Sequence, residues 1–120
     1  MKKYSRILIL ALLVMFMASL PMVGQYRDHA EISRRASELA RQYPDICSAG
    51  SLVKTAGGKE IWLITIGTGT RDNKPGVAIV GGIDGKYILG RELALGVAEN
   101  ILKSSTDDNI RELLGKITFY

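Results

Sequence analysis

The sequence predicts an α/β fold, a mixed β-sheet flanked by helices. Val77–Val80 form an unbroken apolar run, which is typical of a strand buried on both faces. A glycine-rich loop follows, and from Leu89 onward apolar residues recur every three or four positions, as on one face of a helix. Strand, tight loop and helix in this order form the unit in which α/β proteins place ligand sites, at the carboxyl end of the strand. We therefore expect any functional site at Ile83–Tyr87.

The first 24 residues have the composition of a secretory signal peptide. Three basic residues precede an almost wholly apolar run, Ile7–Leu20, and we expect cleavage after Gly24. An uncleaved membrane anchor is the alternative, but a spanning helix needs about 20 apolar residues and this run is shorter. The chain is therefore divided into a signal peptide, residues 1–24, and one domain, residues 25–120. We expect export to the periplasm or the exterior, with no stable membrane anchor after cleavage.

The first element of the domain is a helix from about Asp28 to Tyr43. Asp28 or a neighbour can cap its first turn. The apolar side chains at helical spacing are Ile32, Ala36, Leu39, Ala40 and Tyr43. The charged residues of the other face indicate an ordinary solvated surface. Pro44 ends the helix because the residue before a proline avoids the helical region.

Two strands are expected next, at Ser51–Thr55 and Glu60–Ile66, joined by a glycine turn of hairpin type. The second strand is apolar on both faces, which places it inside the sheet, with Trp62 as a packing residue. Cys47 is the only cysteine, so the chain can form no intrachain disulfide. We interpret it as a buried structural thiol near the start of the first strand.

The long helix after the glycine loop should cover about Leu89–Lys103. Its expected apolar face consists of Leu89, Leu93, Val97 and Ile101, with the flanking Ala94, Ala98 and Leu102. A short capped helix should then run through Leu114. Ile117–Tyr120 has the composition of a strand, and we expect it to form an unpaired edge of the sheet.

The charge balance of the domain gives no support for a nucleic-acid partner. The chain has 16 Lys and Arg against 12 Asp and Glu, and three of the basic residues lie in the signal peptide, leaving 13 against 12. The domain also has no basic run with interleaved aromatic residues. We therefore expect no nucleic-acid partner.

Five fragments occur in an order and spacing that are moderately specific. They are Y-P at Tyr43–Pro44, K-E-I-W-L-I-T-I-G at Lys59–Gly67, K-P-G-V at Lys74–Val77, G-G-I-x-G at Gly81–Gly85, and the closing I-T-F-Y. In these features the chain, from about Tyr26 to Tyr120, resembles the amino-terminal third of the zinc carboxypeptidases, the metallocarboxypeptidase family. The resemblance implies an incomplete domain with an open mixed sheet flanked by helices. It also implies a link to hydrolysis of C-terminal residues from peptides, with zinc as the family cofactor.

The chain departs from the family in the residues that carry the chemistry. In the family the loop after this strand carries H-x-x-E, whose His and Glu bind zinc, and a second His follows much later. The matching positions here are Asp84 and Tyr87; Asp84 could supply a carboxylate oxygen, whereas Tyr87 is not expected to bind. His29, the only histidine, is remote, and Glu92 is interpreted as a solvated or capping carboxylate. The family's catalytic base and carboxylate-binding residues would lie beyond Tyr120.

These departures lead us to expect no catalytic residue and no bound zinc in this chain. Gly81, Gly82 and Gly85 are expected to shape the loop. Asp84 is expected to hold the loop through bonds from backbone N–H groups.

Three hypotheses for function follow, and we prefer the first. It is an exported zinc-carboxypeptidase-like protein that is inactive as it stands. The second is a working metallopeptidase in a longer parent protein, with Asp84 in a variant zinc site. The third is a non-catalytic module that binds a peptide, or an anion held by the glycine loop and the following helix N-terminus.

Overall fold

The computed structural model describes residues 26–120, so the predicted signal peptide lies outside the described part. The helices of this part are α2 (His29–Gln42), α3 (Ile88–Lys103) and α4 (Asp108–Lys116), with a short 3₁₀ helix η1 (Arg71–Asn73). The strands are β1 (Cys47–Lys54), β2 (Glu60–Ile66), β3 (Gly76–Val77) and β4 (Thr118–Phe119). Among residues 26–120, no helix is long and apolar enough to cross a membrane.

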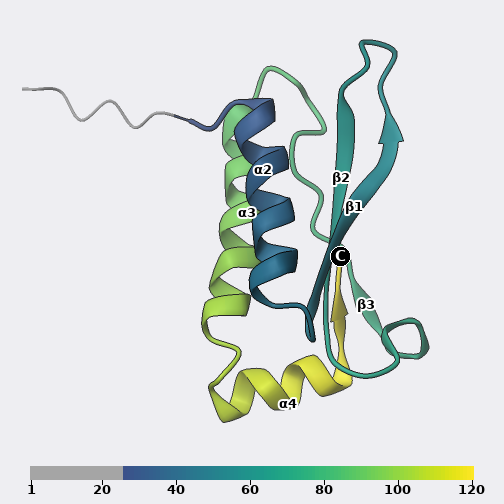
Figure 1. Ribbon diagram of the computed structural model, residues 1–120, viewed down its shortest axis with the longest axis vertical. Coiled ribbons are helices and arrows are strands. Elements are labelled where there is room, and N and C mark those ends of the chain that lie inside the picture. Colours follow the sequence, from purple (N-terminus) through teal and green to yellow (C-terminus); the bar gives the residue numbers. More distant parts are fainter. Residues whose placement is uncertain (1–25) are drawn as a thin grey trace, which may run out of the picture.

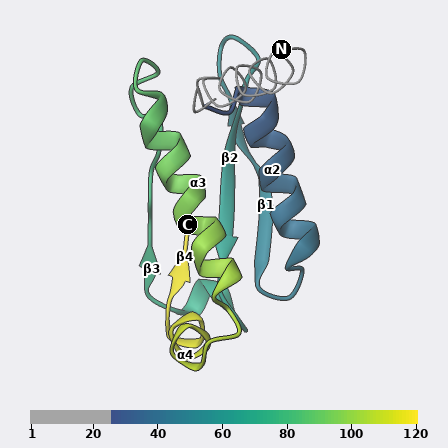
Figure 2. The same ribbon diagram turned by 90° about the vertical axis from the view of Figure 1, so that its left-hand side faces the viewer.

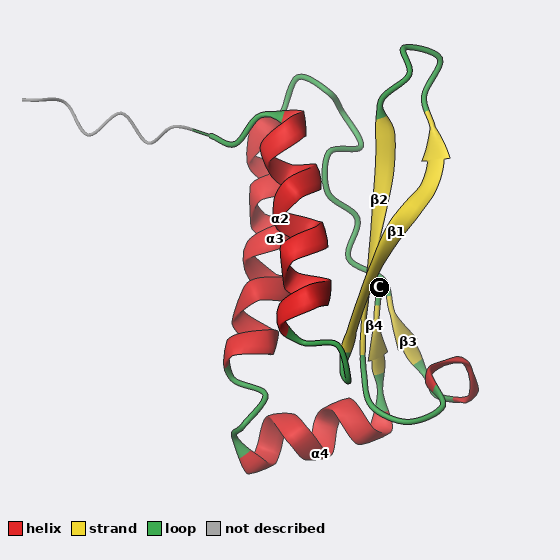
Figure 3. Cartoon of the chain, in the orientation of Figure 1, coloured by secondary structure: helices red, strands yellow, loops and turns green. Residues whose placement is uncertain are grey.

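The four described strands form one mixed sheet in the order β1-β2-β4-β3. β2 pairs antiparallel with both β1 and β4, whereas β4 and β3 are parallel. α2 and α3 lie side by side on one face of this sheet, and α4 crosses its end (Figures 1 and 3). The predicted α/β class is confirmed.

The first helix is α2, and its beginning and end agree with the sequence prediction. Asp28 is its N-cap: the Asp28 carboxylate accepts from the Glu31 N–H at 2.7 Å, and the Glu31 carboxylate accepts from the Asp28 N–H at 2.8 Å. Ala36 and Leu39 are buried on the predicted apolar face. The sequence sufficed here because caps and helical spacing are local signals.

The hairpin is also confirmed, but β1 begins earlier than predicted. It starts at Cys47, which pairs with Ile66, and contains an irregularity between Ser51 and Val53. The small residues at the start of β1 have no strand preference of their own, so pairing with β2 decides their conformation. β2 lies inside the sheet as expected.

The core is a single cluster between the helices and the sheet. Its buried members are Leu39, Cys47, Ile66, Leu95, Ala98, Leu102 and Leu114. Cys47 is therefore the buried thiol that the sequence predicted. Because the cluster joins α2, α3, α4 and the hairpin, these elements depend on one another for burial of apolar surface.

The prediction for the end of the sheet was wrong in two respects. Val77–Val80 do not form a central buried strand: β3 ends at Val77, lies at the edge of the sheet and is exposed, and Val80 is 71 % exposed. β4 is not an edge strand, because it lies between β2 and β3. Figure 2 shows β3 at the border of the sheet, on the α3 side. An apolar sequence allows a strand to be buried, but whether it is buried depends on which elements lie beside it in the fold.

The buried face of α3 agrees with the prediction only in part. Ala98 and Leu102 of the predicted face are buried, and so is Leu95, which was not predicted. Leu89, Leu93 and Val97 were predicted on this face but are exposed. α3 carries apolar residues around most of its circumference, so their spacing does not single out one face. Contact with the sheet and α2 decides which face is buried.

A network of charges joins the start of the domain and α2 to α3. Arg27 and Arg35 both contact Glu99, at 3.4 and 2.6 Å, and Arg27 also contacts Glu92 at 3.1 Å. The Glu99 side chain is only 12 % exposed. Burial alone would raise the pKa of Glu99, but the hydrogen bond and charge of Arg35, together with Arg27 and Lys103, lower it below its ordinary value.

We expect Glu99→Gln to destabilise the protein by about 1–2 kcal/mol at pH 7. The substitution removes the negative charge that pairs with both Arg27 and Arg35, two arginines that are themselves partly exposed. Since folding lowers the pKa of Glu99, its stabilising effect is complete above the unfolded-state value and is lost as the pH falls through the folded-state value. The difference in the free energy of unfolding between wild type and variant, measured with urea, should therefore be large at pH 7 and small in acid. Glu112→Gln is the control, because the Glu112–Lys116 pair is exposed. A difference in the free energy of unfolding that does not change with pH would contradict this account.

Candidate functional site

The segment between β3 and α3 packs closely against the first turns of α3 through Gly81. A Cβ atom at Gly81 would lie 2.6 Å from the Gly90 carbonyl oxygen and 2.8 Å from the Ala94 Cβ, so no side chain fits there. Gly82 has φ +76°, a left-handed conformation that favours glycine. Gly85 has neither property, since a Cβ there would meet nothing within 4 Å. Two of the three predicted loop glycines are therefore required by this geometry.

Asp84 folds the tip of this loop back on itself. Its carboxylate Oδ1 accepts a hydrogen bond from the Lys86 N–H at 3.0 Å, and its carbonyl oxygen accepts one from the Tyr87 N–H at 3.0 Å. This is the local turn that aspartate forms with the backbone two residues later. Tyr87 is the N-cap residue of α3, but its side chain makes no capping bond and it is 72 % exposed.

The residues of this loop do not fit a zinc ion. A catalytic zinc site needs three protein ligands and one open position. Within residues 26–120, no three His, Cys, Asp or Glu side chains lie close enough to hold a metal ion together. Asp84 has one oxygen engaged by the Lys86 N–H, and the side chain of Tyr87 is a poor substitute for a glutamate ligand. The described loop therefore supplies one carboxylate and no complete site.

The other candidates from the sequence lie elsewhere. His29 is the first residue of α2 and does not join any metal-binding group in the described part of the chain. Cys47 is buried, and this burial raises the pKa of its thiol more than the charge of Arg71 lowers it. A thiol in this environment is a poor nucleophile, because the thiolate is the reactive form.

The prediction for Glu92 was wrong. Glu92 is neither solvated nor a cap of α3: its carboxylate accepts from the backbone N–H of Arg27 at 2.8 Å and from the Arg27 guanidinium at 3.1 Å. Arg91 donates to the Arg27 carbonyl oxygen at 2.6 Å. These partners are more than 60 positions apart in the sequence, and no local pattern could have indicated the contact.

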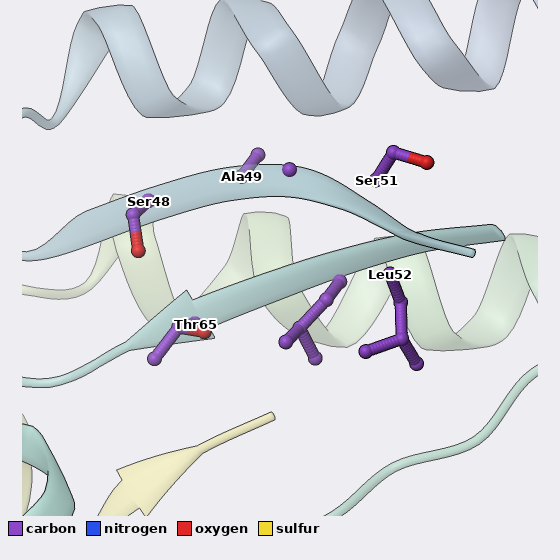
Figure 4. A pocket seen from close by; sticks show the side chains of 7 residues that line it. Ser48, Ala49, Ser51, Leu52 and Thr65 are labelled. Atoms are coloured by element: carbon purple, nitrogen blue, oxygen red, sulfur yellow. The ribbon is translucent and has the colours of Figure 1, made fainter. Parts of the chain in front are cut away.

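A shallow hollow of about 320 Å³ lies on the hairpin (Figure 4). Its lining consists of Ser48, Ala49, Gly50, Ser51, Leu52, Leu63 and Thr65, all from β1 and β2. This lining contains no titratable side chain and does not include the Gly81–Tyr87 loop. The hollow therefore offers hydroxyl and apolar contacts but no group for acid–base chemistry or metal binding.

Two comparisons with known proteins bear on the family of this chain. A search of curated proteins gives no match. The sequence profile of the family described as zinc carboxypeptidase matches residues 32–120, which is well over half of the chain. The matched region contains α3, the glycine loop before it and all four described strands. The chain therefore belongs to the zinc carboxypeptidase family.

Proposed function

We propose that this chain is an exported, carboxypeptidase-like protein that does not itself hydrolyse peptides. The observation that carries the proposal is the Gly81–Tyr87 loop, which we align with the metal-binding loop of the family. Asp84 and Tyr87 stand there in place of the family's His and Glu, and Asp84 is used to form the turn. The loop packs closely on α3 but does not offer the donors that zinc requires.

Because these residues do not form a set of zinc ligands, they do not support the reaction of the family. When bound, zinc polarises the scissile carbonyl and lowers the pKa of its water to about 7. A single carboxylate on an exposed turn does neither. No cluster of His, Cys, Asp and Glu elsewhere in residues 26–120 replaces it.

The proposal is tested by assaying release of C-terminal residues from peptides with the purified chain in zinc-containing buffer. We expect no release above background, and the same result for Asp84→Ala. Release that a chelator abolishes, and that Asp84→Ala removes, would support the variant zinc site instead. Binding of the peptide without release would support a peptide-binding module of the same family.

Export is the second part of the proposal and rests on the basic and apolar composition of residues 1–24. The protein recovered outside the cytoplasm should begin near Gln25. A product that keeps Met1 and remains with the membrane would instead support an anchor.

A further inference from the structure

The loop before α3 contains the only aspartate of the sequence that is followed by glycine, in the pair Asp84–Gly85. No asparagine of the sequence is followed by glycine either. Both residues of the pair are exposed to solvent. In such a pair the backbone nitrogen of the glycine can reach the side-chain carboxyl carbon of the aspartate, because glycine has no Cβ to crowd the approach. The loop therefore carries both reacting groups of a spontaneous rearrangement.

The structure holds the Asp84 carboxyl group beside the Gly85 nitrogen. Oδ1 of Asp84 accepts from the Lys86 N–H at 3.0 Å, so the carboxyl group is folded over the peptide unit that contains this nitrogen. Within residues 26–120, the Gly85 N–H donates no hydrogen bond to another residue. A Cβ atom at Gly85 would meet nothing within 4 Å, so the surroundings leave room for a ring that joins the two residues.

Asp107 offers a matched comparison within the same chain. Its Oδ1 accepts from the Asn109 N–H at 2.9 Å, so its carboxyl group is folded over the next peptide unit in the same way. The residue that follows is Asp108, which carries a side chain and begins α4. The two turns therefore differ in the freedom of the nitrogen that follows the aspartate, which is greater at Gly85.

We propose that Asp84 of the folded protein rearranges spontaneously to isoaspartate. The Gly85 nitrogen forms a bond to Cγ of Asp84, and one carboxyl oxygen leaves as water together with the amide and carboxyl hydrogens, which closes a succinimide ring. A water molecule from the solvent then opens the ring. Its addition at Cγ restores aspartate, whereas its addition at the main-chain carbonyl carbon leaves the chain running through Cγ.

The rearrangement changes the turn at the start of α3. The main chain gains one atom, and the Asp84 carbonyl group, whose oxygen accepts from the Tyr87 N–H at 3.0 Å, becomes a free carboxylate. Because Tyr87 is the N-cap residue of α3, the first turn of the helix loses its fixed entry. The reaction needs only water, so the inference does not depend on the proposed lack of peptidase activity.

The test follows the purified full chain during prolonged incubation in buffer at physiological temperature. Peptides are then mapped by liquid chromatography and mass spectrometry, because an isoaspartyl peptide elutes apart from its parent at unchanged mass. The wild type is compared with Gly85→Ala, whose added methyl group would have no neighbour within 4 Å. The peptide that contains Asp107 is the internal reference, and a wild-type sample unfolded in urea shows the rate without the folded turn.

We expect isoaspartate to accumulate at position 84 about tenfold faster than at position 107, and about tenfold faster than at position 84 of Gly85→Ala, since glycine leaves the nitrogen uncrowded. The folded chain should react at position 84 at least as fast as the unfolded chain, because the fold holds the reacting groups together.

Equal rates at positions 84 and 107, or a Gly85→Ala variant that reacts as fast as the wild type, would overturn the proposal. Rearrangement at position 84 only in the unfolded chain would also overturn it, and would show that the folded loop keeps the Gly85 nitrogen away from the Asp84 carboxyl group.

Discussion

Replacing Leu102 by alanine is expected to lower the free energy of unfolding by about 2–5 kcal/mol, the range for truncating a buried leucine. Leu102 is fully buried and belongs to the cluster that joins α2, α3, α4 and the sheet. The lost side chain leaves a cavity that several elements border, so it cannot close by movement of one of them. Small domains are stable by only about 5–15 kcal/mol, and the variant would lose a large part of that.

The measurement is urea unfolding of the full chain, followed by circular dichroism. Leu52→Ala is the matched control because Leu52 is 65 % exposed on the hairpin. It should change stability by less than about 0.5 kcal/mol. Equal losses for the two variants would show that the described cluster is not the core of the folded protein.

Gly81→Ala is expected to cost about 1–3 kcal/mol, as overpacking usually does. The added methyl group would meet the Gly90 carbonyl oxygen, the Ala94 side chain and the Arg91 Cα, all closer than 3 Å. Two of these contacts are backbone atoms of α3, which cannot rotate away as a flexible side chain can. The loop must therefore move off the helix, or the helix must shift.

Gly85→Ala in the same loop provides the control. A methyl group added at Gly85 would have no neighbour within 4 Å, and Gly85 does not have a positive φ. Alanine there should leave stability within about 0.5 kcal/mol of the wild type. Hydrogen exchange at the α3 N-terminus should likewise rise only in Gly81→Ala. A harmless Gly81→Ala would mean that the loop does not pack on α3 as described.

The features predicted correctly from the sequence have local causes. The Asp28 cap, the Pro44 stop and the glycine turn of the hairpin each act within a few residues, and the helix and hairpin that they delimit formed as expected. The extra length of β1 was missed because its small residues become a strand only by pairing with β2.

The features predicted wrongly depend on contacts between distant segments. Whether Val80 is buried depends on a neighbour beyond β3, and the described chain provides none. The buried face of α3 was assigned correctly only in part, because Leu93 and Leu95 are equally apolar and only packing separates them. The Arg27–Glu92 pair joins residues 65 positions apart, so no periodic pattern contains it.

In the candidate site, too, the features with local causes were predicted and those that depend on distant contacts were not. Glycine spacing indicated a tight loop, and the structure places Gly81 against α3 and Gly82 in a left-handed conformation. The turn that Asp84 forms with the backbone was also predictable, because it involves only the next two residues. Which of the glycines is required could not be predicted, because that depends on how closely α3 approaches Gly81 and on the backbone conformation of Gly82.

The metal content of the purified chain tests the central claim most directly. Elemental analysis after dialysis against zinc would compare the wild type with Asp84→Ala and with the double variant Asp84→His, Tyr87→Glu. We predict less than stoichiometric zinc in the wild type, the same in Asp84→Ala, and more in the double variant, whose two ligands lie on one loop. One tightly held zinc per wild-type chain, lost in Asp84→Ala, would contradict the account and show that the loop is a working variant site.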